Sequence, residues 1–261
     1  MRQAITIAKA QWLDALQNYQ EVILWIVIEA IPILVMASLW TSSGQEFPQS
    51  QISYLVTYYL LVFTITRLTS FYFEKNIQDE IRQGTFSRYL LKPLTVQKYL
   101  FWQNLGGKAF NILFLLFPIL LLVSSLFSEY ILFPQPVNFF LFLISLIIAY
   151  FIQFSLSLLV ACSSFFIEQA FAVNHLHWML DVVVGGYMLP LTFYPQLLQK
   201  LFHFLPFPYL YYLPASIFTG RLPLSSVLSQ IFISVIWAIS LYFLSLFVWR
   251  VGIKKYSSVG G

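Results

Sequence analysis

The chain has 261 residues, of which 59% are hydrophobic and only 9% are charged, and its formal net charge is +4. A soluble domain of this length needs far more surface charge, so the composition indicates an integral membrane protein. We attribute the positive charge to loops beside the membrane, where it sets orientation and contacts lipid headgroups, and not to nucleic-acid binding.

Residues 1–21 predict a helix that lies in the membrane interface. Apolar side chains recur there at helical spacing, namely Ile5, Ala8, Trp12, Leu16 and Tyr19. Because the segment is polar and amphipathic and has no small-residue cleavage site, we expect no cleavable signal peptide.

Six hydrophobic segments predict transmembrane helices, since a bilayer core of about 30 Å takes roughly 20 helical residues. They are Val22–Trp40, Ile52–Ser70, Ala109–Phe127, Phe139–Ala161, Ala172–Leu189 and Val227–Trp249. We therefore predict an all-α, polytopic membrane protein in which residues 1–261 form a single domain.

Two ionisable residues lie inside the first two predicted spans, Glu29 in the first and Arg67 near the inner end of the second. An ionisable side chain within a membrane segment is costly and is a candidate for function. Because the two lie at similar depths, we predict an intramembrane ion pair; the alternative is that Glu29 lines a substrate path.

The block from Phe71 to Lys98, FYFEKNIQDEIRQGTFSRYLLKPLTVQK, holds most of the clustered charge, and hydrophobic spans flank it on both sides. It must therefore be a loop outside the bilayer. Phe73, Ile77 and Ile81 predict a narrow apolar ridge along a short charged helix. Gly84 predicts the end of that helix.

A second, shorter helix is expected after this glycine. Thr85 can cap its start, and it must end before Pro93, because the residue before a proline avoids the α region. Two short charged helices with a kink between them suit a docking surface for another protein.

The connection between the last two spans, residues 190–225, is rich in prolines and aromatic residues. It is too apolar for a solvated loop and too broken to span. We predict a re-entrant hairpin of short helices in the outer leaflet, shielded by protein.

Lysine and arginine residues predict the orientation. Twelve of the fourteen lie in segments that share one side if both termini are inside, whereas only Lys200 and Arg221 lie on the other. By the positive-inside rule the charged block and both termini are cytoplasmic, in the cell (inner or plasma) membrane.

His175, His177 and Asp181 raise the question of a metal site. On a helix only His177 and Asp181 share a face, and one such pair supplies too few ligands. We therefore expect no metal site here. The glycine pairs Gly106-Gly107 and Gly185-Gly186 can be hinges or can allow close helix packing.

Three stretches resemble the permease subunits of ATP-binding-cassette exporters, the ABC type-2 transporter family. EIRQGTFSRYLLKPLTVQKY (Glu80–Tyr99) is similar to their cytoplasmic loop, LPFPYLYYLPASIFTGRL (Leu205–Leu222) to their extracellular hairpin, and KKYSSVGG to their carboxyl-terminal tail. The resemblance implies half of a dimeric transmembrane core, with a second permease subunit (homodimer or heterodimer) and two cytoplasmic ATPase subunits.

The resemblance also implies roles for individual residues. The loop between spans two and three would be the coupling helix, seated in a cleft of the ATPase. Its matching positions, joined by two acids of the same block, are Glu80, Ile81, Arg82, Gly84, Leu90, Leu91, Lys92 and Pro93, with Glu74 and Asp79. The hairpin would form the exit gate, with Pro195, Pro206, Pro208, Pro214 and Gly220.

The chain contains no phosphate-binding loop of its own. The nearest phrase, Gly106-Gly107-Lys108-Ala109, lacks the upstream glycine and the hydroxyl that would hold magnesium. We therefore expect no enzymatic activity in this chain, with ATP and magnesium bound by the partner ATPase.

The predicted function is ATP-driven export of an amphiphilic or lipid-linked substrate. Two rival functions are an intramembrane enzyme using His175, His177, Asp181 or Glu168, and an ion-coupled secondary transporter. The second would be favoured by inverted repeats and broken helices at the midplane, and we see neither.

Overall fold

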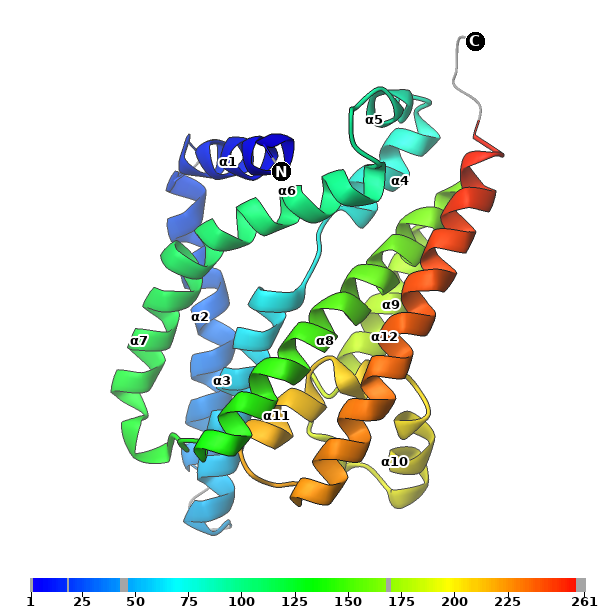
Figure 1. Ribbon diagram of the computed structural model, residues 1–261. Coiled ribbons are helices and arrows are strands. Elements are labelled where there is room, and N and C mark those ends of the chain that lie inside the picture. The colour runs from blue at the N-terminus through cyan, green and yellow to red at the C-terminus, as the bar shows by residue number, and fades with distance from the viewer. Residues whose placement is uncertain (1, 18, 43–46, 168–169, 257–261) are drawn as a thin grey trace.

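The computed structural model describes residues 2–17, 19–42, 47–167 and 170–256 (Figure 1). All regular secondary structure in these ranges is helical, so the all-α class is confirmed. The helices are α1 (Arg2–Gln17), α2 (Tyr19–Ser42), α3 (Gln49–Thr69), α4 (Glu74–Arg82), α5 (Ser87–Leu90), α6 (Val96–Asn111), α7 (Phe117–Leu126), α8 (Pro136–Cys162), α9 (Phe171–Val183), α10 (Gln196–His203), α11 (Tyr212–Phe218) and α12 (Leu224–Ile253).

Within the described residues, five helical stretches are long and apolar enough to cross a membrane. They are Leu24–Ser42, Gln49–Thr69, Val96–Leu126, Pro136–Phe165 and Leu224–Ile253. The first, second, fourth and fifth stretches each contain most of one span predicted from sequence. The third is longer than predicted, because α6 begins thirteen residues before Ala109, at Val96.

The fifth predicted span is only partly helical. The helix expected as far as Leu189 ends at Val183, and the thirteen residues of α9 cover about 20 Å at 1.5 Å per residue. In Figure 1 the chain leaves α8 at the end of the molecule that holds α4 and enters α12 at the end that holds α10. The segment with α9 and residues 184–190 must therefore return the chain between these ends. The count of six spans stays a prediction.

α6 and α7 are joined by a π-helical turn, Ile112–Leu116, where the chain changes direction (Figure 1). Pro118 follows in the first turn of α7, and its ring nitrogen cannot donate to the carbonyl one turn earlier, which accounts for the widened turn. α1 lies across α6, where the Trp12 ring packs 5.7 Å from the Phe110 ring.

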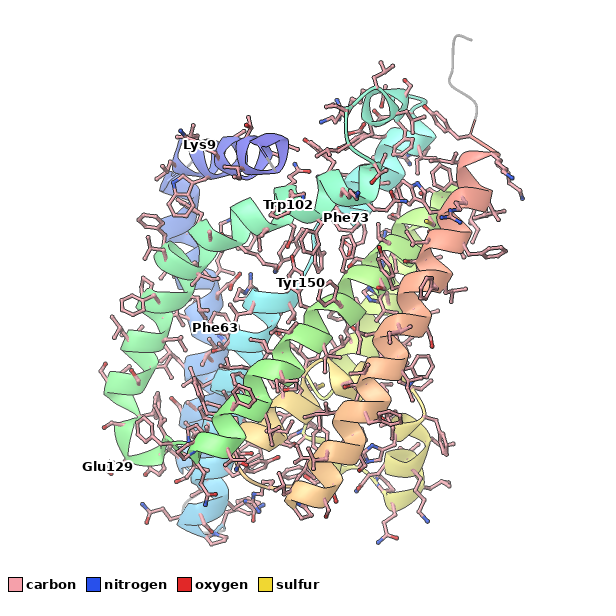
Figure 2. The ribbon with its side chains drawn as sticks, in the orientation of Figure 1. Lys9, Phe63, Phe73, Trp102, Glu129 and Tyr150 are labelled. Atoms are coloured by element: carbon pink, nitrogen blue, oxygen red, sulfur yellow. The ribbon has the colours of Figure 1, made fainter. Side chains whose placement is uncertain are left out.

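α3 is the central helix of the bundle. Most of its side chains between Ile52 and Phe63 are buried, as expected for a helix that is apolar all round. It packs against α2, α8 and α11. Lys9 on α1 and Glu129 after α7 lie at opposite ends of the bundle (Figure 2), and these ends carry the loops predicted as inner and outer.

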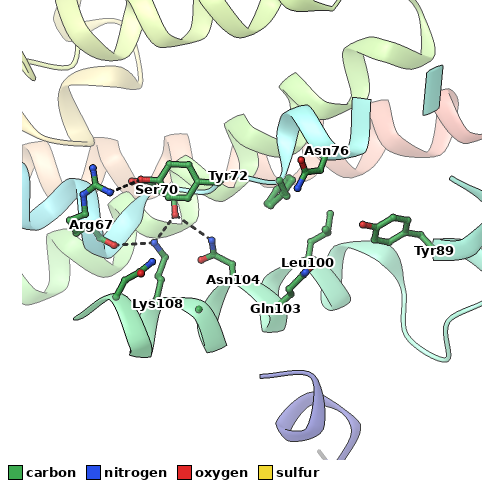
Figure 3. A pocket seen from close by; sticks show the side chains of 12 residues that line it. Arg67, Ser70, Tyr72, Asn76, Tyr89, Leu100, Gln103, Asn104 and Lys108 are labelled. Carbon is green, nitrogen blue, oxygen red and sulfur yellow. Dashed lines mark hydrogen bonds between the residues drawn. The ribbon is translucent and has the colours of Figure 1, made fainter. Parts of the chain in front are cut away.

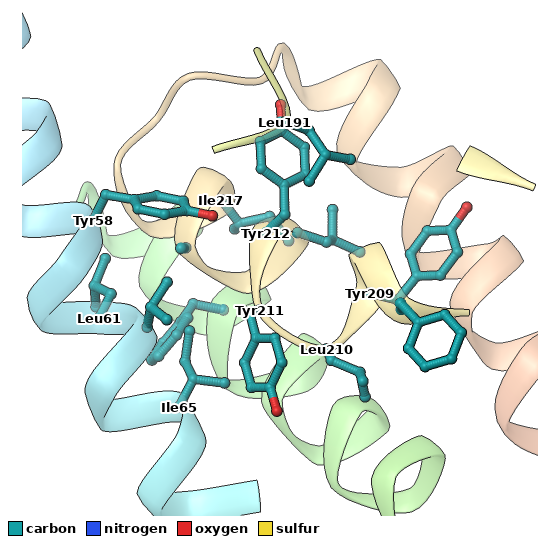
Figure 4. Close-up of a cluster of buried hydrophobic side chains, with 14 of the residues drawn as sticks. Tyr58, Leu61, Ile65, Leu191, Tyr209, Leu210, Tyr211, Tyr212 and Ile217 are labelled. Carbon is teal, nitrogen blue, oxygen red and sulfur yellow. The ribbon is translucent and has the colours of Figure 1, made fainter. Parts of the chain in front are cut away.

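Segment 190–225 is partly buried: residues 206–217 fold back into the protein, whereas α10 lies on its surface. It contains α10, α11 and two short 3₁₀ turns, Leu191–Phe193 and Phe207–Tyr209. The run from Pro206 to Ile217 is buried between α3 and α8 (Figure 4). The irregular backbone is thus shielded by protein, because it would otherwise leave peptide groups unpaired in lipid.

Candidate coupling loop and intramembrane polar sites

The apolar ridge of α4 faces the bundle. Ile77 is fully buried and Ile81 is 9% exposed, and both join a core cluster with Phe154, Leu158 and Trp249 of α8 and α12. The ridge therefore anchors α4 to two long helices, and the opposite, charged face of α4 is left for solvent or a partner.

A glycine ends α4 as predicted, with Gly84 at φ +73°. The amides of Thr85 and Phe86 both donate to the carbonyl of Glu80, over 3.0 and 3.1 Å, which turns the chain sharply. The Phe86 side chain, fully buried, packs edge to face on Trp249 at 5.9 Å.

The second short helix lies where expected, at Ser87–Leu90, but the predicted Thr85 cap is wrong. Phe86 precedes the helix and makes no side-chain cap, and Thr85 Oγ1 lies 3.5 Å from the carbonyl of Glu80. The hydroxyl of Tyr256 replaces the cap: it accepts from the amide of Ser87 at 3.2 Å and donates to the carbonyl of Gly84 at 2.7 Å.

Part of the predicted coupling set lies inside the fold. Glu80 is 8% exposed and forms an ion pair with Arg88. Glu74 lies beside Ser157 of α8, and burial raises the pKa of this carboxyl to about 7. These residues, like Ile81 and Gly84, hold the loop in position and do not form the surface that would contact the ATPase.

The rest of the set points outward. Leu91 is 87% exposed and Leu90 46%, and Arg82 and Pro93 are also exposed. Arg82 Nη2 lies 3.1 Å from Asp79 Oδ1. Lys92 is less free, because its ammonium lies 3.5 Å from the centre of the Tyr99 ring.

Amide side chains tie α4 to α8 and α9. Gln78 Nε2 donates to the carbonyl of Val160 at 2.8 Å, and Asn174 Nδ2 of α9 donates to Gln78 Oε1. Sequence reasoning missed Gln78, although it stands one turn after Glu74 on the same face of the helix.

The polar contacts continue along α8 and α9. Gln153 Nε2 lies 3.4 Å from Asp181 Oδ2, and His177 Nε2 lies 3.9 Å from the same oxygen. Together with Glu74, Gln78, Ser157 and Asn174, the residues Gln153, His177 and Asp181 lie between α4, α8 and α9. We call this set the polar seam. Gln153 Oε1 and Ser157 Oγ, both buried, have no hydrogen-bond partner among the described residues, a cost in stability that marks the seam as a functional candidate.

The seam ends at the loop after α9, which α3 holds by two hydrogen bonds. Tyr58 Oη donates to the carbonyl of Gly186 at 2.6 Å, and Tyr59 Oη to that of Met188 at 2.8 Å. Gly186 has φ +84°, and a Cβ on Gly185 would lie 2.4 Å from the carbonyl oxygen of Asp181. This glycine pair serves close packing and a left-handed turn.

The structure brings Glu29 and Arg67 together, with Glu29 Oε1 2.7 Å from Arg67 Nη1. Arg67 also donates to Tyr72 Oη at 3.2 Å. Nearby, Lys108 Nζ donates to the carbonyls of Arg67 and Ser70 at 3.3 and 2.6 Å (Figure 3). Lys108 thus caps the carboxyl end of α3, where a cation is favoured.

The predicted gate residues fall into two groups. Pro206, Pro208 and Pro214 are buried in the core between α3 and α8, whereas Pro195 is exposed before α10. Gly220 is exposed and has φ +67°, and it ends the turn after α11.

A family model described as "ABC-2 family transporter protein" matches residues 23–260 of the chain. The chain belongs to the ABC-2 transporter family. Searches of curated proteins and of solved structures give no significant match. The family assignment covers both the charged loop and segment 190–225, as the resemblance of the motifs predicted.

As an ABC-2 permease the chain is a multi-pass membrane protein and the transmembrane component of an ABC transporter, a class that works with an ABC ATPase. Within the described ranges no three His, Cys, Asp or Glu residues gather as metal ligands. His175 is exposed and stacks on Phe171 at 3.9 Å, away from the His177–Asp181 pair.

Proposed function

We propose that this permease subunit exports a substrate when a cytoplasmic ATPase pushes on the loop 71–98. The observation that carries the proposal is the double attachment of α4. Its apolar ridge packs on α8 and α12, and its amide Gln78 joins α8 and α9. A push on the exposed face of α4 and α5 therefore reaches three long segments at once.

The docking surface has both charge and apolar contact. Arg82 and Arg88 supply positive charge, and Leu90, Leu91 and Pro93 supply exposed apolar area. Beside them is a cavity of about 670 Å³, lined by Lys75, Gln78, Asp79, Arg82, Ser164, Ala170, Phe171, Asn174 and His175. A ridge on the ATPase that fills this cavity would hold α4 and the start of α9 together.

The polar seam supplies a route from this surface to segment 190–225. Gln78 and Glu74 on α4 are followed by Gln153 on α8 and Asp181 on α9. Asp181 stands one turn before Gly185, whose carbonyl accepts from the amide of Tyr212 at 3.1 Å. Movement of α4 would shift this contact and open the gate formed by Pro195, Pro206, Pro208, Pro214 and Gly220.

The same proposal includes the topology. Six spans with both termini in the cytoplasm place the loop beside the ATPase, and α1 lies along the inner membrane surface. A second permease subunit completes the pathway, lipid surrounds it, and ATP and magnesium bind in the ATPase. The cargo is amphiphilic or lipid-linked, since the spans carry few polar groups.

Co-purification with a candidate ATPase tests the proposal. Arg82→Glu and Leu91→Asp are expected to abolish co-purification, while the matched variants Arg221→Glu and Leu197→Asp, at the opposite end of the bundle, leave it unchanged. Full retention of the ATPase by both loop variants would exclude this docking surface.

Ion-coupled transport is the second candidate, because the seam contains two carboxyl groups, on Glu74 and Asp181. Transport by the permease alone in vesicles, driven by a proton or sodium gradient, would favour it. Transport that requires the ATPase and ATP, with no response to either gradient, favours the first function.

A further inference from the structure

Two cavities of different character share one side chain, Arg67. The first measures about 240 Å³ and lies between the carboxyl end of α3 and α6 (Figure 3). The second measures about 360 Å³ and lies between α2, α3 and α9. The side chain of Arg67, and with it the Glu29 ion pair, forms the boundary between them.

The first cavity is polar and basic. Its lining includes Arg67, Tyr72, Asn104, Lys108 and Asn111 and contains no acidic residue. Two of the three ammonium protons of Lys108 go to backbone carbonyls. An anion placed here would favour the protonated form of Lys108 and would be stabilised by its charge.

The second cavity is apolar apart from its boundary. Aromatic and aliphatic side chains dominate its lining, among them Trp25, Phe63, Trp178 and Met188. The charge of Glu29 is already offset by Arg67 at 2.7 Å. A hydrocarbon chain would bury its surface here, where water would gain few hydrogen bonds.

We propose that the two cavities form one binding site for an anionic amphiphile, with its hydrocarbon chain against Trp25 and Trp178 and its phosphate-like headgroup between Arg67 and Lys108. This inference rests on the proposed function and names the class of its cargo. The site lies where the segment after α3 meets α6, and Tyr72, the loop residue that accepts from Arg67 at 3.2 Å, is part of its wall. A bound headgroup would therefore touch the coupling loop directly.

Tryptophan quenching by brominated probes tests the proposal on the full-length permease in neutral lipid nanodiscs, without ATPase. The probes are 11-bromoundecyl phosphate and 11-bromoundecyl trimethylammonium, which share a chain and differ in headgroup charge. We expect saturable quenching by the phosphate probe with at least tenfold lower Kd than the ammonium probe. Replacing Trp25 and Trp178 together by Phe should remove the saturable part.

Charge variants identify the headgroup contacts. Arg67→Gln is expected to raise the Kd of the phosphate probe about tenfold, and Lys200→Gln, a matched variant on α10, to leave it unchanged. Glu29→Gln removes the competing carboxylate and should lower that Kd. Asn111→Leu, which leaves the ion pair intact, should also weaken phosphate binding, so the result does not depend on one variant that could misfold.

Equal affinity for both probes, or tighter binding of the ammonium probe, would overturn the proposal, as would an Arg67→Gln variant that melts like the parent chain and binds phosphate equally well. Because no ATPase is present, failure here leaves the coupling function standing. Loss of ATPase co-purification in the loop variants, conversely, leaves this binding site untouched.

Discussion

Tyr256 Oη donates a hydrogen bond to the carbonyl of Gly84 over 2.7 Å and so joins the carboxyl end of α12 to the turn between α4 and α5. The same oxygen accepts from the amide of Ser87 at 3.2 Å. The loop proposed to meet the ATPase is thus braced by a residue that follows α12, 172 positions away in sequence.

Tyr256→Phe removes both hydrogen bonds but keeps the ring that packs 5.5 Å from Phe86. We expect a loss of about 1 kcal/mol in the free energy that holds the turn closed. Amide hydrogen exchange of residues 84–92 should rise, and ATPase stimulation by substrate should fall. Tyr242→Phe, an exposed position on α12, is the control, and unchanged exchange in both variants would contradict the bracing role.

Gly186→Ala is expected to destabilise the protein by more than Gly220→Ala. Both positions have positive φ, +84° and +67°, so each variant carries backbone strain of about 1 kcal/mol. At Gly186 the new Cβ would also lie 2.7 Å from Tyr58 Oη, whereas at Gly220 its nearest neighbour is Asn138 Nδ2 at 3.3 Å. Thermal unfolding in detergent measures the difference, and equal melting temperatures would show that the Tyr58 contact can yield.

Glu74 should make the stability of the protein fall as pH rises. Burial raises the pKa of its carboxyl from 4.5 to about 7, so the folded state binds more protons than the unfolded state between these values. The stabilisation is full below pH 4.5 and is lost as pH rises through 7, by up to about 3 kcal/mol. Melting curves at pH 5 and pH 8 test this.

In the matched pair of variants for this titration, Glu74→Gln should flatten the pH dependence and Asp79→Asn should keep it. The Asp79 side chain is 39% exposed, so Asp79→Asn leaves the carboxyl group of Glu74 and its surroundings in place. A Glu74→Gln variant with the parent's pH profile would assign the titration to another group.

Gln78→Leu should separate ATPase binding from transport. The substitution unpairs the side-chain amide of Asn174, at a cost of about 1–3 kcal/mol, whereas the carbonyl of Val160 keeps its hydrogen bond from Ser163 Oγ at 2.6 Å. Gln78 lines the cavity proposed to receive the ATPase but is only 7% exposed, so we expect co-purification of the ATPase to persist and transport to fall. The double variant Gln78→Leu with Asn174→Leu should recover part of the stability, and full additivity of the two effects would exclude direct coupling.

Much of the fold could be predicted from sequence, because apolar segment length reports on the bilayer without knowledge of neighbours. The charged loop, its apolar ridge and its glycine stop followed from local spacing, and a pairing of Glu29 with Arg67 followed from similar depth. The extent of the fifth span could not be predicted in this way. Its hydropathy continues to Leu189, but α9 ends at Val183, and Tyr58 and Tyr59 of α3 hold the carbonyls of Gly186 and Met188 in the loop that follows.

Composition and periodicity alone determined the all-helical class, the membrane environment and the position of the loop, because each depends on residues close together in the chain. Only the tertiary structure decided which loop residues face inward, how Gln78 and Tyr256 hold the loop, and that two cavities meet at Arg67. These depend on contacts between helices distant in sequence, and a polar side chain in an apolar span does not reveal its partner until the helices are packed.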